Sequence, residues 1–293
     1  MTVVQAIYTS IPAVVRTKDE LNGIELKHPI AAVFTMGALH QGHAKLMDEA
    51  RNYLEEFGDG LGTVIVTIFV NPTQFENPDD LASYPQTIES DIEVCAKSKV
   101  DVVFAPQAIE IYPNAQALKE RISAGRLGEI LEGASRPAHF DAVLTVVRRL
   151  IQITEPDVLF FGEKDFQQLV LVRQMVQELN LPVKVIGVPT VRDTNGLALS
   201  SRNKQLDESE LNVATHLYES LTLAQQGIDK NWELSEIKKQ CIEFLQEETD
   251  LELDYFEILN ESLQAPQPTE KLRALVAAKI GGVRLIDNIS LNH

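Results

Sequence analysis

Apolar segments alternate with amphipathic segments through the first two thirds of the chain. The apolar segments are residues 30–33, 63–70, 100–105, 158–161 and 183–188. Stretches with apolar residues at helical spacing lie between them, at 44–57, 87–97, 115–122, 142–153 and 166–179. This alternation is typical of parallel strands covered by helices on both faces, because each helix returns over the sheet before the next strand. It predicts an α/β fold with a Rossmann-like, doubly wound parallel sheet that binds ligands at the carboxyl ends of its strands.

The last third of the chain has a different pattern, with two helical segments at 207–226 and 235–247. The first opens with Asp207 and has Glu210 three residues later, which is the signature of a helix cap. Three strand-like segments follow, at 253–259, 273–280 and 282–289. Helices followed by a group of strands predict a small α+β unit.

Chain length and this change of pattern together favour two domains. The chain has 293 residues, which is more than a single hydrophobic core usually organises. We expect a Rossmann-like domain over residues 1–190 and a smaller C-terminal α+β domain over residues 191–293.

The charge balance disfavours several classes of partner. A formal net charge of −17 argues against nucleic acid and anionic membranes, because both attract clustered Lys and Arg. No apolar run approaches the length of a membrane span, and the N-terminus does not have the pattern of a signal peptide. Cys95 and Cys241 lack the spacing of a zinc site and are expected to be free thiols. These features predict a cytoplasmic protein with small-molecule ligands.

Residues 34–43 join the first apolar strand to the helix expected at 44–57. Such a turn directs unpaired backbone N–H groups and the positive end of the helix dipole towards the carboxyl end of the strand, which suits a phosphate. His40 and His43 are three residues apart, so both imidazoles can face that phosphate as hydrogen-bond donors. The same pattern also fits an ordinary helix start with two solvated histidines.

Two further loops carry cations. Lys164 lies at a second strand-to-helix junction, where the helix dipole disfavours a cation unless an anion is bound. Ser200, Ser201 and Arg202 place two hydroxyls beside a guanidinium, and these donors suit phosphate oxygens. The alternatives are a surface lysine paired with a neighbouring carboxylate, and serines that serve as turn or cap residues.

Neutral amides lie next to these loops. Gln74 follows an expected strand and Gln168 follows Lys164, so both can hold a carboxylate substrate without a tight ion pair. Glutamines are usually surface residues, and only this placement favours a site. The roles of Arg136 and His139 stay open, since His139 fits a base, a phosphate donor or a packed residue.

Motifs spaced in order over nearly the whole chain indicate a family. They are Met36-Gly37-Ala38-Leu39-His40-Gln41-Gly42-His43, Asn71-Pro72-Thr73-Gln74-Phe75, Phe161-Gly162-Glu163-Lys164-Asp165, Gln167-Gln168, Ser200-Ser201-Arg202-Asn203 and Arg284-Leu285-Ile286-Asp287-Asn288. Together they resemble the pantothenate synthetase family (pantoate–β-alanine ligases), within the H-x-G-H nucleotidyltransferases. The resemblance implies that the first domain binds nucleotide and pantoate and that the C-terminal domain is a lid.

The resemblance also implies a reaction. It is the ATP-dependent condensation of (R)-pantoate with β-alanine to pantothenate, with release of AMP and pyrophosphate through a pantoyl-adenylate. ATP would be a substrate, Mg²⁺ a cofactor and the protein a homodimer. His43, His40, Lys164 and Arg202 would be the catalytic residues, with His43 as the proton donor.

The binding residues implied by the resemblance are more numerous. The nucleotide contacts would be Met36, Gly37, Ala38, Leu39, His40, Gln41, Gly42, His43, Gly162, Glu163, Lys164, Asp165, Val191, Leu199, Ser200, Ser201 and Arg202. Gln74 and Gln168 would hold pantoate, and Gln74 would also contact β-alanine. The residues that would bind Mg²⁺ are unknown.

Three positions depart from the family pattern. Phe34 replaces a usual proline, Gln86 a usual arginine and Ala138 a usual glycine. None of them removes an implied catalytic group, so they bear on efficiency more than on the reaction. The proline-rich stretch 71–86, expected to be irregular, is a natural cover for an adenylate that water would otherwise hydrolyse.

The same residues weigh against other functions. Another adenylyl transferase would keep AMP in its product, and a tRNA-charging enzyme is disfavoured by the acidic charge. The intact His40, His43, Lys164 and Arg202 disfavour a catalytically silent nucleotide-binding regulator. Zinc hydrolysis through His40, His43 and His139 would leave the cation-bearing loops unexplained.

Overall fold

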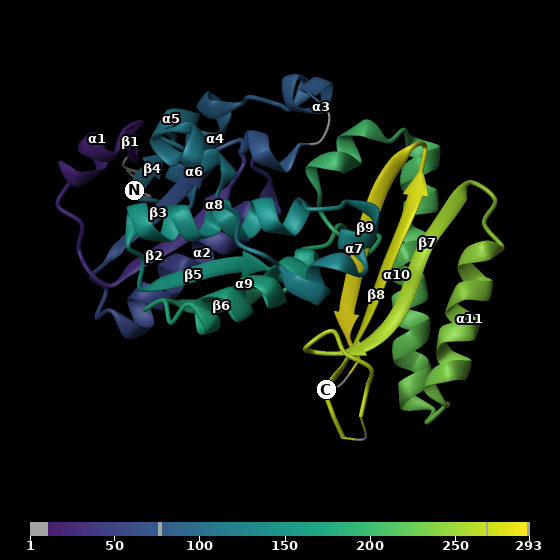
Figure 1. Cartoon of the computed structure of the whole chain (residues 1–293). Helices are drawn as coiled ribbons and strands as arrows, with labels where there is room; N and C mark the ends of the chain where they lie inside the picture. The colour runs from purple at the N-terminus through teal and green to yellow at the C-terminus, as the bar shows by residue number, and fades with distance from the viewer. Residues whose placement is uncertain (1–10, 76–77, 268, 292–293) are drawn as a thin grey trace, which may run out of the picture.

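The computed structural model describes residues 11–75, 78–267 and 269–291. Its main feature is a six-stranded sheet with the strand order β1-β4-β3-β2-β5-β6 (Figure 1). The strands are β1 (Ala13–Val15), β2 (Ile30–Thr35), β3 (Thr63–Ile68), β4 (Val102–Phe104), β5 (Val158–Gly162) and β6 (Lys184–Val188). Every strand pair in this sheet is parallel, which confirms the predicted doubly wound fold.

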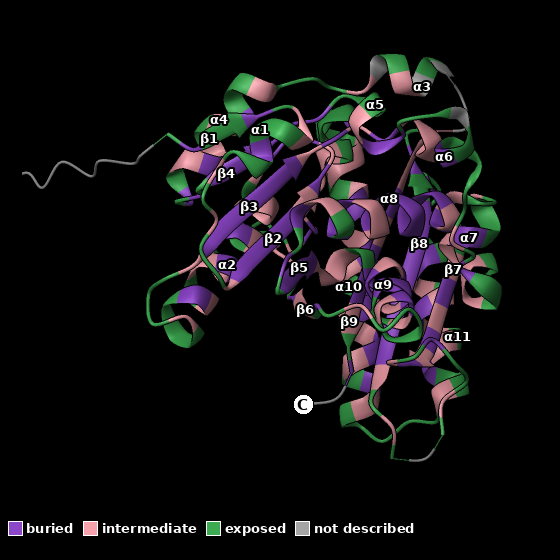
Figure 2. Ribbon diagram, turned by 60° about the vertical axis from the view of Figure 1, so that its left-hand side comes forward, coloured by how far each residue is buried: buried purple, intermediate pink, exposed green. Residues whose placement is uncertain are grey.

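Helices cover both faces of this sheet, as predicted. On one face, α2 (Gln41–Phe57) and α4 (Ile88–Lys97) bury their apolar sides in a core shared with β2, β3 and β5. On the other face, α8 (His139–Thr154) and α9 (Phe166–Glu178) contribute to a second core with the same strands. The central strands are therefore buried on both sides (Figure 2), which explains why they are continuously apolar.

The structure contains several short helices that were not predicted from the sequence. They are α1 (Lys18–Asn22), η1 (Pro72–Gln74), α3 (Pro78–Ser83), α5 (Ala108–Ile111), η2 (Gly125–Glu129), α7 (Glu132–Ser135), η3 (Glu163–Asp165) and η4 (Ser201–Gln205). The predicted short helix near 115–122 is present as α6 (Ala115–Lys119). The expectation of an irregular stretch over 71–86 is wrong for η1 and α3, and residues 76 and 77 lie outside the described residues. Turns this short have too few residues to show a helical period.

A second, antiparallel sheet follows the parallel one, with the order β7-β8-β9. Its strands are β7 (Leu251–Asn260), β8 (Leu272–Ile280) and β9 (Val283–Ser290). The helices α10 (Glu208–Asp229) and α11 (Leu234–Gln246) cover one of its faces (Figure 1). Asp207 and Glu210 form the predicted capping box at the start of α10.

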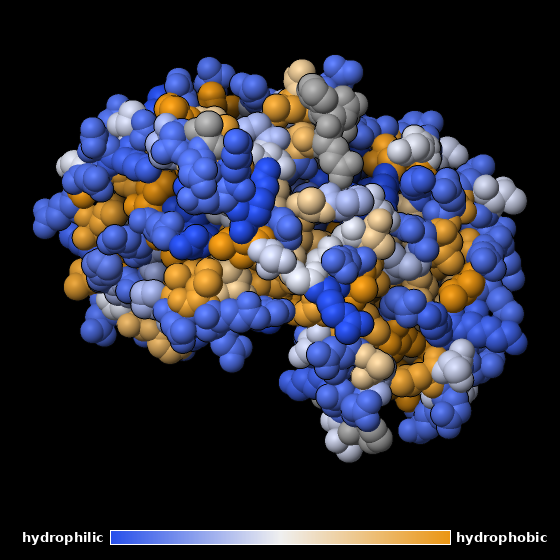
Figure 3. Space-filling view, viewed as in Figure 1, coloured by the Kyte–Doolittle hydropathy of each residue, from blue (hydrophilic) through white to orange (hydrophobic). Residues whose placement is uncertain are grey.

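The other face of the small sheet lies against the parallel-sheet part. Leu275, with the partly buried Tyr255 and Leu259, packs in the same core as α8 and α9. The parallel sheet ends at Val188 and α10 begins at Glu208, so the predicted domain boundary after residue 190 falls in the connection between them and stays a prediction. Hydrophilic residues cover most of the face seen in Figure 3. Among the helices in the described ranges, none combines the length and apolarity that a bilayer crossing requires.

Candidate active site

The two histidines of the loop between β2 and α2 form hydrogen bonds with its backbone. His40 is the N-cap of α2, and its Nδ1 accepts a hydrogen bond from the Gly42 N–H at 3.1 Å. The His43 Nδ1 accepts a hydrogen bond from the His40 N–H at 3.2 Å. The two ring centroids are 4.1 Å apart. Gly42 leaves room for this arrangement, because a Cβ there would be 2.8 Å from Cε1 of His40.

These contacts fix the protonation of both rings. Burial lowers the pKa of His43 to about 3, with a smaller contribution from His40. Burial and then the charge of Lys164 also lower the pKa of His40. Both imidazoles are therefore neutral near pH 7, and since each Nδ1 accepts a hydrogen bond, each ring carries its proton on Nε2. Each ring therefore has one Nε2–H group as a hydrogen-bond donor.

The backbone of this loop is used differently from the prediction. The N–H groups of Ala38 and Leu39 donate to the carboxylate of Asp91 at 3.1 and 2.8 Å, and the Gly42 N–H is bound to His40. The expectation that unpaired amides of the turn face a phosphate is therefore wrong for these three residues. A buried carboxylate has taken two of these backbone amides, so the donors that remain in this part of the loop include the imidazole side chains.

Asp91 is a site-forming residue that the sequence analysis missed. It lies on α4, is 1% exposed, and also accepts a hydrogen bond from the Thr87 hydroxyl. Its position four residues before the buried Cys95 places it on the inner side of the helix. An acidic residue on an otherwise apolar helical side was the signal available in the sequence.

The second loop, between β5 and α9, brings Lys164 to the site. The Lys164 side chain is 16% exposed, and its Nζ is 3.8 Å from a carboxylate oxygen of Asp165, which is half exposed. Burial raises the pKa of Asp165, but Lys164, Arg202 and then His43 outweigh that effect and hold the pKa below its usual range. The predicted alternative, a lysine paired with a neighbouring carboxylate, is therefore present as a loose ion pair between Lys164 and Asp165. Asp165 is ionised at pH 7.

The third loop carries Ser200 and Arg202. It follows a hairpin whose base is closed by a hydrogen bond from the Leu199 N–H to the carbonyl of Val191 at 2.9 Å. Ser200 caps η4, since its Oγ accepts a hydrogen bond from the Arg202 N–H at 3.2 Å. Ser200 is therefore a cap residue, as one of the alternatives from the sequence proposed. Its hydroxyl oxygen accepts in the cap, so its hydroxyl proton remains available to an anion.

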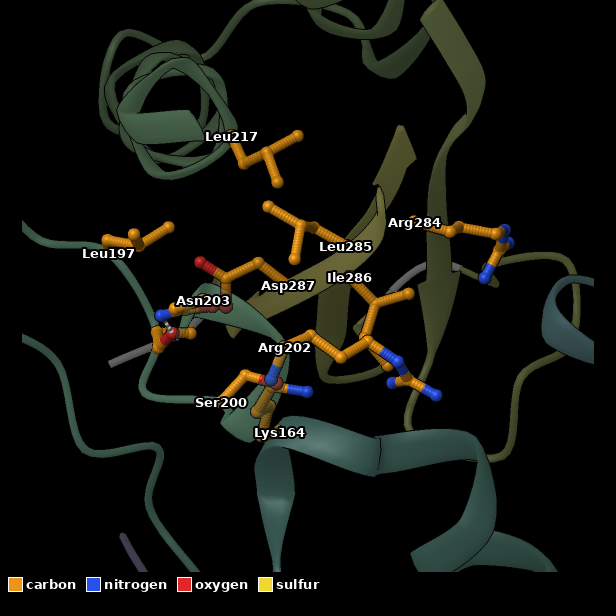
Figure 4. Close-up of a pocket in the computed structure, with 11 residues that line it drawn as sticks. Lys164, Leu197, Ser200, Arg202, Asn203, Leu217, Arg284, Leu285, Ile286 and Asp287 are labelled. Carbon is orange, nitrogen blue, oxygen red and sulfur yellow. Dashed lines mark hydrogen bonds between the residues drawn. The ribbon is translucent and has the colours of Figure 1, made fainter. Parts of the chain in front are cut away.

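These three loops converge at the carboxyl end of the parallel sheet. The charge of Lys164 lowers the pKa of His40 and His43, and the charge of Arg202 lowers the pKa of Asp165 and His139. Each cation therefore lies close enough to these side chains for an electrostatic interaction. Lys164, Ser200 and Arg202 line one pocket beneath β9 (Figure 4). The site therefore gathers cations and neutral donors in a chain whose net charge is −17.

The predicted amides take two different positions at this site. Gln168 lines a second pocket together with His139, Lys164 and Asp165. Gln74 ends η1, and its Oε1 accepts a hydrogen bond from Asn71 Nδ2 at 3.0 Å, which leaves the Gln74 Nε2 group as the donor. Asn71 is 1% exposed and had no assigned role in the sequence analysis.

His139 lies in the second pocket with a neutral ring. Burial, followed by the charges of Arg136 and Arg202, lowers its pKa to about 3. It is hydrogen bonded to the backbone of Gln74, while its Nδ1 is buried and has no hydrogen-bond partner within the described part of the chain. The role of His139 therefore stays open, and its unpartnered Nδ1 can accept a hydrogen bond from a ligand.

The three departures from the family pattern differ in their surroundings. Phe34 is partly buried and packs against the core of α8 and α9. Gln86 is exposed, and the structure offers no account of that replacement. Ala138 has a φ of 58°, a left-handed conformation that favours glycine and explains the residue that is usual there.

Comparisons with known proteins agree with this geometry. The family model described as Pantoate-beta-alanine ligase matches residues 7–290. A pantothenate synthetase from a Nocardioides species is 42% identical over an alignment of 294 positions, which covers 97% of this chain and 86% of that protein. The crystal structure of pantothenate synthetase from Thermus thermophilus has a TM-score of 0.88, is 36% identical, and covers 96% of this chain and 100% of its own. A pantoate-beta-alanine ligase from Francisella tularensis, crystallised with beta-gamma ATP and beta-alanine, has a TM-score of 0.76, is 36% identical, and covers 96% and 98%.

Proposed function

Because the chain belongs to the pantoate-beta-alanine ligase family, we propose that it condenses pantoate with β-alanine, using ATP, to form pantothenate, AMP and pyrophosphate. The related ligase crystallised with beta-gamma ATP and beta-alanine supports this choice of substrates. The observation that carries the proposal is the meeting of two neutral, Nε2-protonated imidazoles with Lys164 and Arg202 at one end of the sheet.

The first half-reaction forms a pantoyl-adenylate. A carboxylate oxygen of pantoate attacks the α-phosphorus of ATP, and the bond to the bridging oxygen of pyrophosphate breaks. Negative charge grows on the equatorial oxygens and on the leaving group, so fixed donors there lower the barrier. In this proposal, His40 and His43 donate Nε2–H hydrogen bonds to the phosphate oxygens, and Lys164 and Arg202 neutralise the triphosphate. The proton that His43 donates is shared in such a hydrogen bond and stays on its neutral ring.

The second half-reaction transfers the pantoyl group. The uncharged amine of β-alanine attacks the acyl carbon, AMP leaves with the pair of electrons of the C–O bond, and the amine loses a proton.

Gln74 and Gln168 hold pantoate by neutral hydrogen bonds, which leave its carboxylate more nucleophilic in the first half-reaction than an ion pair would. Asn71 supports this role because it donates to the Gln74 oxygen and so leaves the Gln74 NH₂ group as the donor for a ligand.

Mg²⁺ fits this site as a companion of the nucleotide. The ion prefers one or two carboxylates, with phosphate oxygens and water as the other ligands. Asp165 is an ionised, half-exposed carboxylate beside Lys164, and the described residues contain no group of three His, Cys, Asp or Glu side chains that could hold a metal. Asp165 would therefore hold Mg²⁺ only together with the triphosphate, where the ion would neutralise charge on the leaving pyrophosphate.

Four further features belong to this proposal. A homodimer and a lid function for residues 191–293 are implied by the family, whereas a cytoplasmic location and a cover function for the stretch 71–86 are predictions from the sequence. The cover would keep water from the adenylate, which predicts that deletion of the distal part of the stretch lowers the ratio of pantothenate formed to AMP released. An unchanged ratio would argue against the cover.

Product analysis tests the reaction. The protein is incubated with ATP, Mg²⁺ and pantoate, with and without β-alanine, and the products are separated by chromatography. We expect pantothenate, AMP and pyrophosphate in equal amounts when β-alanine is present, and exchange of labelled pyrophosphate into ATP when it is absent. A stable adenylylated product that forms without β-alanine would indicate a different adenylyl transferase, and binding of ATP without turnover would indicate a regulator.

A further inference from the structure

Two successive residues of β9 contact both cation-bearing loops. Asp287 and Asn288 are 3% and 4% exposed, and neither was assigned a function from the sequence. Successive side chains of a strand point to opposite faces of the sheet. Asp287 lies on the side of β9 that faces α10, and Asn288 lies on the side that faces the parallel-sheet part. Each residue holds a different loop.

Asn288 holds the loop that carries Lys164. Its Nδ2 group donates to the backbone carbonyls of Glu163 and Lys164, both at 2.9 Å. Its Oδ1 accepts a hydrogen bond from Arg273 at 2.7 Å, and Arg273 is also paired with the Glu163 carboxylate at 3.2 Å. Because both ends of the amide are bonded, its orientation is fixed. The base of the Lys164 side chain is therefore attached to the small sheet.

Asp287 holds the loop that carries Arg202. Its carboxylate forms a two-pronged contact with the guanidinium of Arg192, with the second hydrogen bond at 2.9 Å. Arg192 also donates to the carbonyl of Gly196 at 3.0 Å, across the turn of the hairpin that leads to Ser200 and Arg202. The hairpin is thereby attached to β9 at Asp287, next to the residue that holds the Lys164 loop.

We propose that the Asp287–Asn288 pair sets the distance between Lys164 and Arg202 and so matches the two cations to the triphosphate of ATP. This inference rests on the proposed function, because the spacing matters only when a polyanion spans both side chains. Neither residue of the pair needs to touch the nucleotide, so both are positioning residues. A purely structural contact between the two parts of the chain would instead affect folding and leave ATP binding unchanged in the folded protein.

The substitution Asn288→Asp tests the pair. It keeps the shape of the side chain and the acceptor for Arg273, but it replaces the donor with an oxygen that faces two carbonyls. We expect the dissociation constant for ATP to rise about tenfold or more, because the two hydrogen bonds that hold the Lys164 loop are lost. The matched control is Asn260→Asp, the same change at a buried position of β7, whose amide contacts Glu270. It is expected to leave ATP affinity within about twofold of the wild type.

A double-mutant cycle with Lys164→Ala separates positioning from simple repulsion by the new charge. If Asn288 acts through Lys164, Asn288→Asp weakens ATP binding much less in the Lys164→Ala background than in the wild type. Repulsion of ATP by the new carboxylate would weaken binding equally in both backgrounds and would overturn the inference. Unchanged ATP affinity in Asn288→Asp would overturn it as well.

Asp287→Asn provides a second variant should Asn288→Asp not fold. It keeps the side-chain shape and removes the charge that faces Arg192, so ATP affinity is expected to fall about tenfold, and wild-type affinity would count against the pair. Affinity is measured by calorimetry with ATP alone, which does not depend on turnover. Pantothenate formation by the wild type tests the proposed function separately, so failure of one idea is distinguishable from failure of the other.

Discussion

The carboxylate of Asp91 accepts the backbone N–H of Leu39 at 2.8 Å, although 52 residues separate them in the chain. The other carboxylate oxygen accepts the N–H of Ala38, so one side chain of α4 holds the middle of the loop between β2 and α2. This loop positions His40 and His43. The position of the histidine pair therefore depends on a side chain of α4, which is a distant element in the sequence.

Asp91→Asn should loosen the histidine loop. An asparagine offers one acceptor for two backbone donors and turns its NH₂ group towards one of them, so we expect a loss of about 1–3 kcal/mol in the free energy of unfolding. ATP affinity should fall with it. Urea unfolding and calorimetry check both quantities. Asp48→Asn, the same change at an exposed position of α2, should stay within about 0.5 kcal/mol of the wild type.

Substitutions should distinguish the roles of the two ring nitrogens of His43. His43→Ala is expected to reduce exchange of pyrophosphate into ATP about 100-fold or more, as for loss of a transition-state donor. Glutamine can place an N–H near the position of Nε2, whereas asparagine can replace only the Nδ1 acceptor that binds the His40 N–H. His43→Gln should therefore retain more exchange than His43→Asn. The reverse order, or wild-type exchange in His43→Ala, would refute the role given to Nε2.

Lys164→Ala should remove a positive charge from the triphosphate site. We expect pyrophosphate exchange to fall about 100-fold or more. The control is Lys239→Ala, which removes a charge from a 62% exposed lysine of α11 and should leave exchange unchanged. Equal activities for the two variants would mean that Lys164 is only a surface partner of Asp165.

Acid should destabilise the folded protein through its neutral histidines. The pKa values of His43 and His139 are lowered from 6.5 to about 3, so the unfolded chain binds protons more readily than the folded one. Stability from this source is complete above pH 6.5 and decreases as the pH falls towards 3, by about 1.4 kcal/mol per pH unit for each histidine. Urea unfolding at pH 7, 6 and 5 should show this slope.

A substitution identifies the histidine responsible for that slope. His139→Gln cannot be protonated and should make the decrease in stability between pH 7 and 5 less steep. His28→Gln, at a side chain that is 65% exposed, should not do so. If the slope of His139→Gln equals that of the wild type, His139 does not resist protonation in the folded state.

Ala138→Gly should stabilise the protein. Ala138 is exposed and has a φ of 58°, so glycine relieves backbone strain at the start of α8 without loss of packing. After the entropy of the more flexible unfolded chain is subtracted, a gain of about 0.5–1 kcal/mol is expected. The same change in a regular helix, Ala96→Gly in α4, should cost about 0.5–1 kcal/mol. Thermal unfolding of both variants measures the contrast.

Local patterns were sufficient for the architecture. The apolar runs that became β2, β3 and β5 are continuous because helices bury both faces of the sheet, and this burial leaves a direct mark on the sequence. The capping box of α10 could be identified for a similar reason, since Asp207 and Glu210 are close neighbours in the chain. The helical turns η1 and α3 escaped prediction because a few residues show no period, and Asn71 and two prolines there resembled an irregular stretch.

Sequence patterns predicted the parallel sheet, its helices, the family motifs and the positions of His40, His43 and Lys164 at strand-to-helix junctions. The contacts that hold these residues became known only from the folded chain. The contacts of Asp91 with Leu39, Asn288 with the Lys164 loop and Asp287 with Arg192 join residues 52, 124 and 95 positions apart. Periodicity reports the environment of neighbours along the chain, whereas the partner of a buried polar group depends on which elements meet in space. For the same reason the protonation of the histidine rings became evident only once their hydrogen bonds and burial were known.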